Sequence, residues 1–155
     1  MAVDLAKPDL IVAVFGAGTM GRGIAQVCAQ AGVTTLLFDS RDGAVKEAIA
    51  AVDKGLEGLV AKQRMTAAAK KGVLDHLKPI NSLDDAKGAG IVIEAIVEDL
   101  AAKRELFREL EKRVSPDCVL ATNTSSLSVT KVAAGCERPE RVGGLHFFNP
   151  PPLMR

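Results

Sequence analysis

The chain has 155 residues, of which 48% are hydrophobic and 25% charged, and this composition predicts a soluble globular domain with a sizeable apolar core. The 20 Lys and Arg residues are balanced by 19 Asp and Glu residues, which argues against a broad nucleic-acid surface because phosphate binding requires a basic stripe. Three widely spaced cysteines indicate neither a disulfide framework nor a metal site, and no apolar run approaches the roughly 20 residues that span a bilayer. We expect a cytoplasmic protein without membrane or nucleic-acid partners.

The first apolar run, residues 10–15, predicts a strand, and the sequence Gly-Ala-Gly-Thr-Met-Gly follows it at residues 16–21. In a strand-to-helix turn, three glycines at this spacing have separate tasks. Gly16 permits the tight turn, Gly18 lets the backbone approach a pyrophosphate at the helix N-terminus, and Gly21 lets the helix pack closely on the strand. The predicted cofactor contacts in this turn are Gly16, Gly18, Thr19, Met20 and Gly21.

The glycine turn leads into a predicted helix, which Gly32 ends before a second strand at residues 33–38. Asp39 follows that strand, 18 residues beyond Gly21. An acid at this place accepts hydrogen bonds from the adenosine ribose and repels a 2′-phosphate. We therefore predict NAD rather than NADP as the cofactor, although Arg41 is close enough in sequence to accommodate that phosphate.

Helices and strands alternate in the rest of the chain. We predict helices at residues 42–63, 66–71, 100–114 and 127–134, and strands at residues 77–80, 90–95, 119–122 and 142–147. Six strands grouped three and three around the glycine turn predict an α/β fold, a doubly wound parallel Rossmann sheet with the order 3-2-1-4-5-6. Such a sheet binds ligands at the carboxyl ends of its strands.

The predicted domain organisation has three parts. Residues 1–9 form an N-terminal extension, residues 10–148 a NAD-binding Rossmann domain, and residues 149–155 the start of a linker. The linker prediction depends on the run Asn-Pro-Pro-Pro at residues 149–152, which follows an apolar segment directly.

Three further segments carry polar side chains at or just after predicted strand ends. They read Ile-Glu-Ala-Ile-Val-Glu at 93–98, Asn-Thr-Ser-Ser at 123–126 and His-Phe-Phe-Asn-Pro at 146–150. Together with the glycine turn, these motifs resemble the NAD-binding domain of the 3-hydroxyacyl-CoA dehydrogenase family over residues 10–154. The resemblance implies oxidation of a 3-hydroxyacyl-CoA to the 3-oxoacyl-CoA with hydride transfer to NAD, in fatty acid or short-chain acyl-CoA metabolism such as beta-oxidation. It also implies a homodimer in the full-length protein.

The resemblance implies a role for individual residues. His146 matches the general base that takes the hydroxyl proton, a task that suits an imidazole because its unperturbed pKa is about 6.5. Ser125 matches a serine that hydrogen-bonds the reacting oxygen and the cofactor side, and Lys62 matches a lysine that meets the CoA. The predicted cofactor contacts outside the glycine turn are Asp39, Ala95, Glu98, Lys103, Asn123 and Asn149.

Each of these side chains also has a simpler interpretation. His146 could be a hydrogen-bonded histidine at a strand end, and Ser125 and Asn123 could cap the helix that follows them. Glu98 and Lys103 could be exposed charges at the start of an amphipathic helix, and the lysine assigned to CoA could be one more solvated lysine.

One expected feature of the family does not occur in this sequence. The family's histidine is oriented by a glutamate shortly after it, and no acidic residue follows Glu140 here. A partner of that kind controls the tautomer of the ring and stabilises the imidazolium. We therefore expect the family's helical second domain to be absent from this chain, and turnover by these residues alone to be weak.

Three functions remain open from the sequence. The first is an NAD-dependent 3-hydroxyacyl-CoA dehydrogenase, with this chain as its cofactor-binding domain carrying the histidine. The second is a non-catalytic dinucleotide-binding module of the same fold, which the missing glutamate favours. The third is a related NAD-dependent dehydrogenase of hydroxy acids or sugar nucleotides, against which the segment Leu-His-Phe-Phe-Asn-Pro at 145–150 argues.

Overall fold

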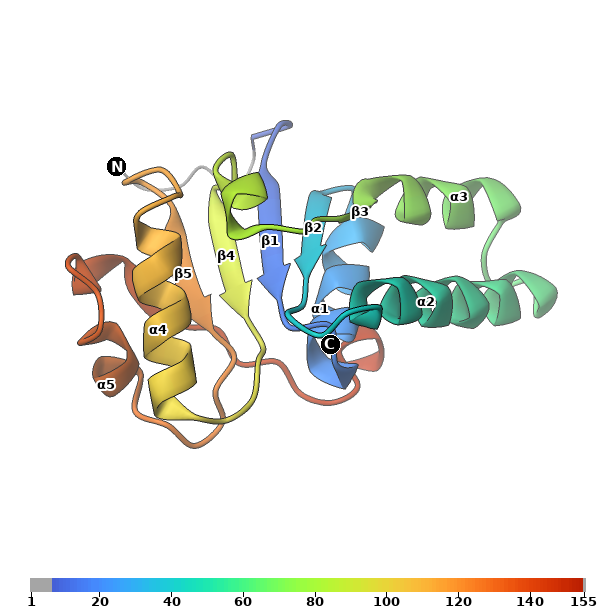
Figure 1. Ribbon diagram of the computed structural model, residues 1–155. Coiled ribbons are helices and arrows are strands. Elements are labelled where there is room, and N and C mark those ends of the chain that lie inside the picture. Colours follow the sequence, from blue (N-terminus) through green and yellow to red (C-terminus); the bar gives the residue numbers. More distant parts are fainter. Residues whose placement is uncertain (1–6, 155) are drawn as a thin grey trace.

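In residues 7–154, which the computed structural model describes, six parallel strands form one sheet in the order β3-β2-β1-β4-β5-β6 (Figure 1). The strands are β1 (Ile11–Phe15), β2 (Thr34–Phe38), β3 (Leu77–Pro79), β4 (Ile91–Glu94), β5 (Val119–Thr122) and β6 (Val142–Gly144). The predicted doubly wound Rossmann sheet and its strand order are therefore confirmed.

Helices cover both faces of this sheet. They are α1 (Thr19–Gln30), α2 (Ala44–Ala61), α3 (Ala67–His76), α4 (Leu100–Glu111) and α5 (Val129–Ala133), with short 3-10 turns η1 (Leu83–Ala86), η2 (Pro139–Arg141) and η3 (Pro151–Leu153). In Figure 1, α1 lies behind the sheet and α4 in front of it, while α2 and α3 form a hairpin that extends past the β3 edge. Within the described part of the chain, no helix has both the length and the apolar character needed to cross a membrane.

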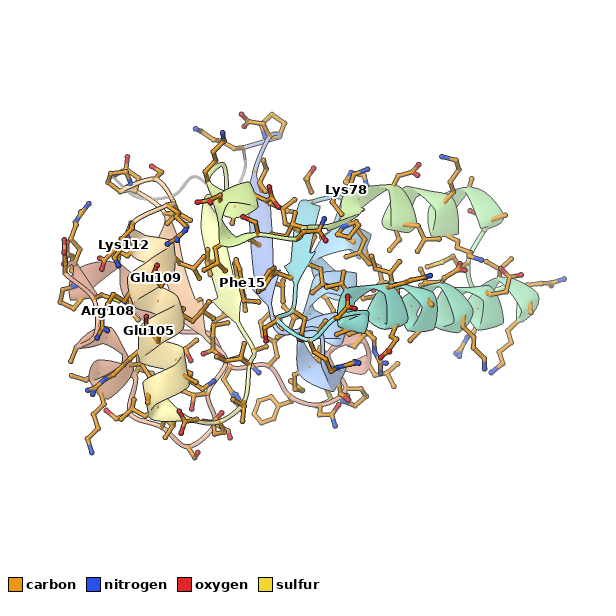
Figure 2. The ribbon with its side chains drawn as sticks, viewed as in Figure 1. Phe15, Lys78, Glu105, Arg108, Glu109 and Lys112 are labelled. Carbon is orange, nitrogen blue, oxygen red and sulfur yellow. The ribbon has the colours of Figure 1, made fainter. Side chains whose placement is uncertain are left out.

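The central strand β1 supplies both halves of the core. Val12 and Val14 belong to the apolar cluster under α1 and α2, and Ala13 and Phe15 belong to the cluster under α4, because successive side chains of a strand point to opposite faces. Phe15 is fully buried. Figure 2 shows Phe15 in the interior, whereas charged side chains cover the outer surface of α4. Those labelled are Glu105, Arg108, Glu109 and Lys112.

The strand register brings the carboxyl ends of five strands to one level. Phe15 pairs with both Phe38 and Glu94, Glu94 pairs with Thr122, and Thr122 pairs with Gly144. The residues that follow these ends are Gly16, Asp39, Ala95, Asn123 and Leu145. The glycine turn and the polar strand ends therefore share one edge of the sheet, the edge at which open α/β folds bind ligands.

The glycine turn has the conformation that the spacing predicts. Gly16 has φ +104°, and a Cβ there would lie 2.4 Å from the carbonyl oxygen of Ala95. A Cβ on Gly21 would lie 1.7 Å from the carbonyl oxygen of Gly16. Around Gly18, in contrast, a Cβ would meet nothing within 4 Å. Gly16 and Gly21 thus bring backbone segments together, while Gly18 leaves open space over the start of α1.

The last strand is shorter than predicted. The sequence predicts a strand over 142–147, but β6 ends at Gly144. The amide of Leu145 still donates to the carbonyl of Thr122 on β5, whereas the amide of Phe147 donates to the side-chain Oδ1 of Asn123 at 2.8 Å. A side chain has therefore replaced the next backbone acceptor of the ladder, and the chain leaves the sheet at this point.

Several helix boundaries also differ from the prediction: α2 is Ala44–Ala61 rather than 42–63, and α4 ends at Glu111 rather than residue 114. Thr66 caps α3 as predicted, since its hydroxyl accepts the amide of Ala69 at 3.0 Å, but the helix continues to His76 rather than residue 71. The last helix, predicted over 127–134, begins only at Val129. Its N-terminal cap is Ser128, which accepts the amide of Lys131 at 3.3 Å. The alternative that Ser125 or Asn123 caps this helix is therefore wrong.

The proline run packs against α1. Pro151 is buried in η3, and a Cβ on Gly23 of α1 would lie 2.9 Å from its ring. The predicted linker at 149–155 therefore begins on the surface of the sheet domain, and its last residue lies outside the described residues, as do residues 1–6 of the predicted N-terminal extension. The division into extension, domain and linker remains a prediction.

We predict that Gly21→Ala destabilises the fold strongly. The added methyl group would collide with the Gly16 carbonyl, a backbone atom that cannot move without moving the turn. We expect the free energy of unfolding in urea to fall by about 3 kcal/mol or more. Gly55→Ala is the matched control, because Gly55 lies inside α2 with open space around it, and this variant should gain up to about 1 kcal/mol. Equal stabilities of the two variants would contradict the close approach.

Candidate functional site

A groove of about 460 Å³ lies beside the glycine turn on the β1–β2 half of the edge. It is lined by the turn, by Asp39 and by apolar side chains such as Val97 and Leu106. Asp39 accepts the amide of Ala17 at 2.7 Å through Oδ2 and the amide of Arg41 at 2.8 Å through Oδ1. The carboxylate is thus held at the wall of the groove, and its remaining lone pairs are available to ligand hydroxyl groups.

Arg41 is paired with Glu47 in a forked ion pair. Its Nη2 lies 2.6 Å from Oε2 of Glu47, and its Nη1 lies 3.3 Å from Oε1. The hydrogen bond and the charge attraction raise the pKa of Arg41 and lower that of Glu47. The guanidinium group of Arg41 is therefore bound to a glutamate. From its sequence position alone, Arg41 could have bound a 2′-phosphate.

The start of α1 presents free backbone donors next to this groove. Its N-terminal cap is Gly18, and no side chain makes a cap hydrogen bond there. The first amides of a helix lack partners within the helix and lie at the positive end of its dipole. Thr19 and Gly21 lie in the first turn that carries these amides. Uncapped amides beneath the open space at Gly18 fit a pyrophosphate group.

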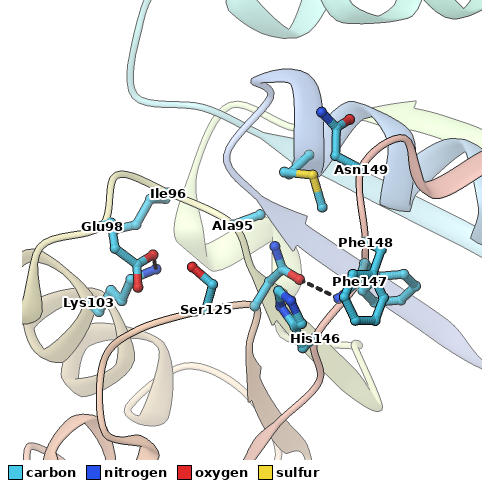
Figure 3. A pocket seen from close by; sticks show the side chains of 11 residues that line it. Ala95, Ile96, Glu98, Lys103, Ser125, His146, Phe147, Phe148 and Asn149 are labelled. Carbon is cyan, nitrogen blue, oxygen red and sulfur yellow. Dashed lines mark hydrogen bonds and ion pairs between the residues drawn. The ribbon is translucent and has the colours of Figure 1, made fainter.

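A second cleft, of about 310 Å³, opens on the β4–β6 half of the same edge (Figure 3). Its walls are Met20, Ala95, Ile96, Glu98, Lys103, Asn123, Ser125, His146, Phe147, Phe148 and Asn149. Except for Ile96, Phe147 and Phe148, these are residues that the sequence predicts for the site. In the view of Figure 3, Ser125 lies between the Glu98–Lys103 pair and His146. The structure therefore brings residues from four segments into one cleft.

Lys62 does not join this group. It follows the last residue of α2, is exposed, and lines neither the groove nor the cleft. Figure 1 shows the end of α2 projecting away from the sheet. Its assignment to CoA remains a prediction.

A buried ion pair lies under the cleft. Lys103 Nζ is 2.6 Å from Oε1 of Glu94, and both side chains are almost completely buried. Glu94 also accepts the amide of Ile96 and the hydroxyl of Thr122, each at 2.7 Å. This carboxylate therefore ties α4, the loop after β4 and the end of β5 together. The alternative that Lys103 is an exposed helix charge is wrong.

Glu94, the charged partner of Lys103, has no role in the prediction from sequence. The sequence does contain an indication of this role. Glu94 is a carboxylate at the end of a central strand, and the three residues before it, 91–93, are apolar. A charge in such a place is buried only when it is paired, and Lys103 is nine residues further along the chain.

Glu98 connects the same network to the cleft surface. Its Oε1 accepts the hydroxyls of Thr124 and Ser126, the latter at 3.3 Å, and its Oε2 lies 3.6 Å from Lys103 Nζ. The side chain is 39% exposed. Partial burial by itself would raise the pKa of Glu98, but the Thr124 hydrogen bond, the Lys103 charge and the Ser126 hydrogen bonds outweigh it and lower the pKa below 4.5.

His146 faces the cleft because its neighbour is anchored. The amide of Phe147 is bound by Asn123, and the Phe147 ring packs against the core under α1. His146 and Phe148 are exposed on either side of it, with ring centroids 5.0 Å apart in an edge-on contact. Among residues 7–154, no group hydrogen-bonds the imidazole. Residues 7–154 therefore give no support to the alternative of a hydrogen-bonded structural histidine.

Residues 11–155 match the family described as 3-hydroxyacyl-CoA dehydrogenase, NAD binding domain. The chain belongs to this family. Over 144 residues it is 42% identical to a 3-hydroxybutyryl-CoA dehydrogenase of Clostridioides difficile, with 93% of this chain and 51% of the relative covered. It is 43% identical to a 3-hydroxyadipyl-CoA dehydrogenase of Escherichia coli K12, with 93% and 30% covered.

Solved structures of the family share this fold. The crystal structure of 3-hydroxybutyryl-CoA dehydrogenase from E. coli K12 matches with a TM-score of 0.91 and 43% identity, over 94% of this chain and 31% of that one. The (S)-3-hydroxybutyryl-CoA dehydrogenase from Ralstonia eutropha matches with a TM-score of 0.89 and 42% identity, over 93% and 51%. The chain spans between about a third and about half of the length of these relatives.

We predict that Lys103→Met lowers the free energy of unfolding by about 3–5 kcal/mol, because it leaves the Glu94 carboxylate buried without its ion-pair partner. Lys112→Met, at the C-cap of the same helix, is the control. That ammonium is more than half exposed beside Glu109, and its loss should cost less than about 1 kcal/mol. Urea unfolding measures both values. A loss at position 103 as small as that at position 112 would contradict the account of the buried pair.

Proposed function

We propose that the chain binds NAD(H) across the carboxyl edge of its sheet and carries the proton acceptor for the oxidation of a 3-hydroxyacyl-CoA to a 3-oxoacyl-CoA. The observation that supports this most directly is the cleft that brings His146 and Ser125 together beside the glycine turn. The family's description names an NAD-binding domain, and the relatives are named as dehydrogenases of 3-hydroxybutyryl-CoA and 3-hydroxyadipyl-CoA.

The adenosine half of the cofactor fits the groove beside Asp39. In a doubly wound sheet the dinucleotide crosses the point where the strand order reverses, here between β1 and β4. The carboxylate of Asp39 would accept the ribose hydroxyls, and its charge would repel a 2′-phosphate. Arg41, which could offset that repulsion, is paired with Glu47. These features support NAD as the preferred cofactor.

The nicotinamide half would then lie over the second cleft, against Met20, Ala95, Glu98, Lys103, Asn123 and Asn149. When bound, the nicotinamide ring accepts the hydride from the carbon that bears the hydroxyl group. His146 would accept the hydroxyl proton on its imidazole, which has no hydrogen bond to release within residues 7–154. Ser125 would donate a hydrogen bond to the same oxygen, whose partial charge grows as the proton leaves.

The substrate would be an acyl-CoA, with Lys62 at the exposed end of α2 as a contact for the CoA. The protein would be a cytoplasmic homodimer.

A non-catalytic dinucleotide-binding module is the second candidate function. It is favoured by the absence of an acidic side chain at the imidazole within the described residues, because such a partner stabilises the protonated ring. Both candidates predict cofactor binding, and only the first predicts turnover.

We predict that His146→Gln abolishes turnover and leaves cofactor binding intact. In the full-length protein, oxidation of NADH by acetoacetyl-CoA should fall by about 100-fold or more, because the proton donor and acceptor is lost. The dissociation constant for NADH, measured by calorimetry, should stay unchanged. His76→Gln is the control, since His76 ends α3 and does not line the cleft.

The outcomes separate the two candidate functions. A fully active His146→Gln protein would refute the assigned base. Tight NADH binding without turnover by the unmodified full-length protein would favour the binding module. No detectable heat with either NADH or NAD⁺ would refute the cofactor site itself.

A further inference from the structure

The charges under the second cleft do not balance. Lys103 supplies one positive charge, and Glu94 and Glu98 supply two negative charges. The Lys103 ammonium is 2.6 Å from Glu94 but 3.6 Å from Glu98, so it is engaged mainly by the buried carboxylate. The surplus negative charge therefore belongs to Glu98, whose side chain is 39% exposed and lines the cleft.

The fold keeps this surplus charge in place. The hydroxyls of Thr124 and Ser126 both donate to Oε1 of Glu98, and hydrogen bonds to a carboxylate favour its ionised form. Among the described residues that line the cleft, Glu98 and Lys103 are the only Asp, Glu, Lys or Arg side chains. Within this part of the chain, no second cation at the cleft wall compensates Glu98.

A dinucleotide bound in this site would place near Glu98 a ring whose charge depends on its redox state. The adenosine end belongs at Asp39 on the β1–β2 half, so the nicotinamide end belongs at the carboxyl ends of β4 and β5, where the cleft lies. The oxidised nicotinamide ring carries a positive charge, and the reduced ring is neutral. A carboxylate at the wall of the cleft attracts the charged ring more strongly than the neutral one.

We propose that Glu98 is a specificity-determining residue that makes the cleft favour the oxidised cofactor over the reduced one. The inference rests on the proposed function, because it requires NAD(H) in this site. Glu98 would thus do more than contact the cofactor. Its negative charge would stabilise NAD⁺ before hydride transfer, and this attraction would be lost once the ring is reduced. Glu98 thereby shifts the ratio of the two affinities toward NAD⁺.

The test compares dissociation constants for NAD⁺ and NADH, measured by calorimetry at pH 8 on the full-length protein. Glu98→Gln keeps the size and the hydrogen-bonding oxygen but removes the charge. We expect it to weaken NAD⁺ binding about tenfold more than NADH binding, a difference of about 1.4 kcal/mol. Glu98→Asp keeps the charge and should largely keep the ratio of the two constants. Glu105→Gln removes an exposed charge on α4 that is paired with Arg108, and should change neither constant.

The result that would overturn the inference is an unchanged ratio of the two constants in Glu98→Gln. A shift in Glu98→Asp as large as that in Glu98→Gln would also overturn it, since the effect would then depend on shape rather than charge. Both results leave the proposed function standing, because they require cofactor binding. Absence of binding of both cofactor forms to the unmodified protein would overturn the proposed function and this inference together.

Discussion

The site depends on three backbone segments that meet without side chains between them. The carbonyl of Gly16 occupies the place where a Cβ of Gly21 would be, and the carbonyl of Ala95 occupies the place of a Cβ at Gly16. The turn after β1, the first turn of α1 and the end of β4 are therefore fixed relative to one another. This contact lies where the strand order reverses, and it separates the groove of Asp39 from the cleft of His146.

In the half of the edge that holds the cleft of His146, buried charges rather than glycine contacts hold the backbone segments together. Glu94 is bound by an ammonium, a backbone amide and a hydroxyl that come from three different segments, so both of its carboxylate oxygens accept hydrogen bonds. Thr124 and Glu98 continue the network to the cleft wall. A buried ion pair of this kind contributes little net stability compared with an apolar contact, but it fixes where a charge stands. Here it leaves a single carboxylate facing the cleft.

The sequence predicts the glycine turn and the strand order because both depend on local patterns: a spacing of three glycines and apolar runs of strand length. It also predicts which residues gather at the carboxyl edge. The environment of Lys103 could not be predicted in this way, because its burial depends on Glu94 in a neighbouring strand. The end of β6 could not be predicted either, since the amide of Phe147 donates to the side chain of Asn123 instead of a backbone carbonyl.

The central claim is that one dinucleotide spans both halves of the edge, with its two linked phosphates over the start of α1. A crystal structure of the chain grown with NADH tests this most directly. The account predicts the adenosine ribose on Asp39, the pyrophosphate over Gly18 and the nicotinamide ring beside Ser125 and His146. A cofactor bound with its phosphates away from α1, or with its ribose away from Asp39, would contradict it.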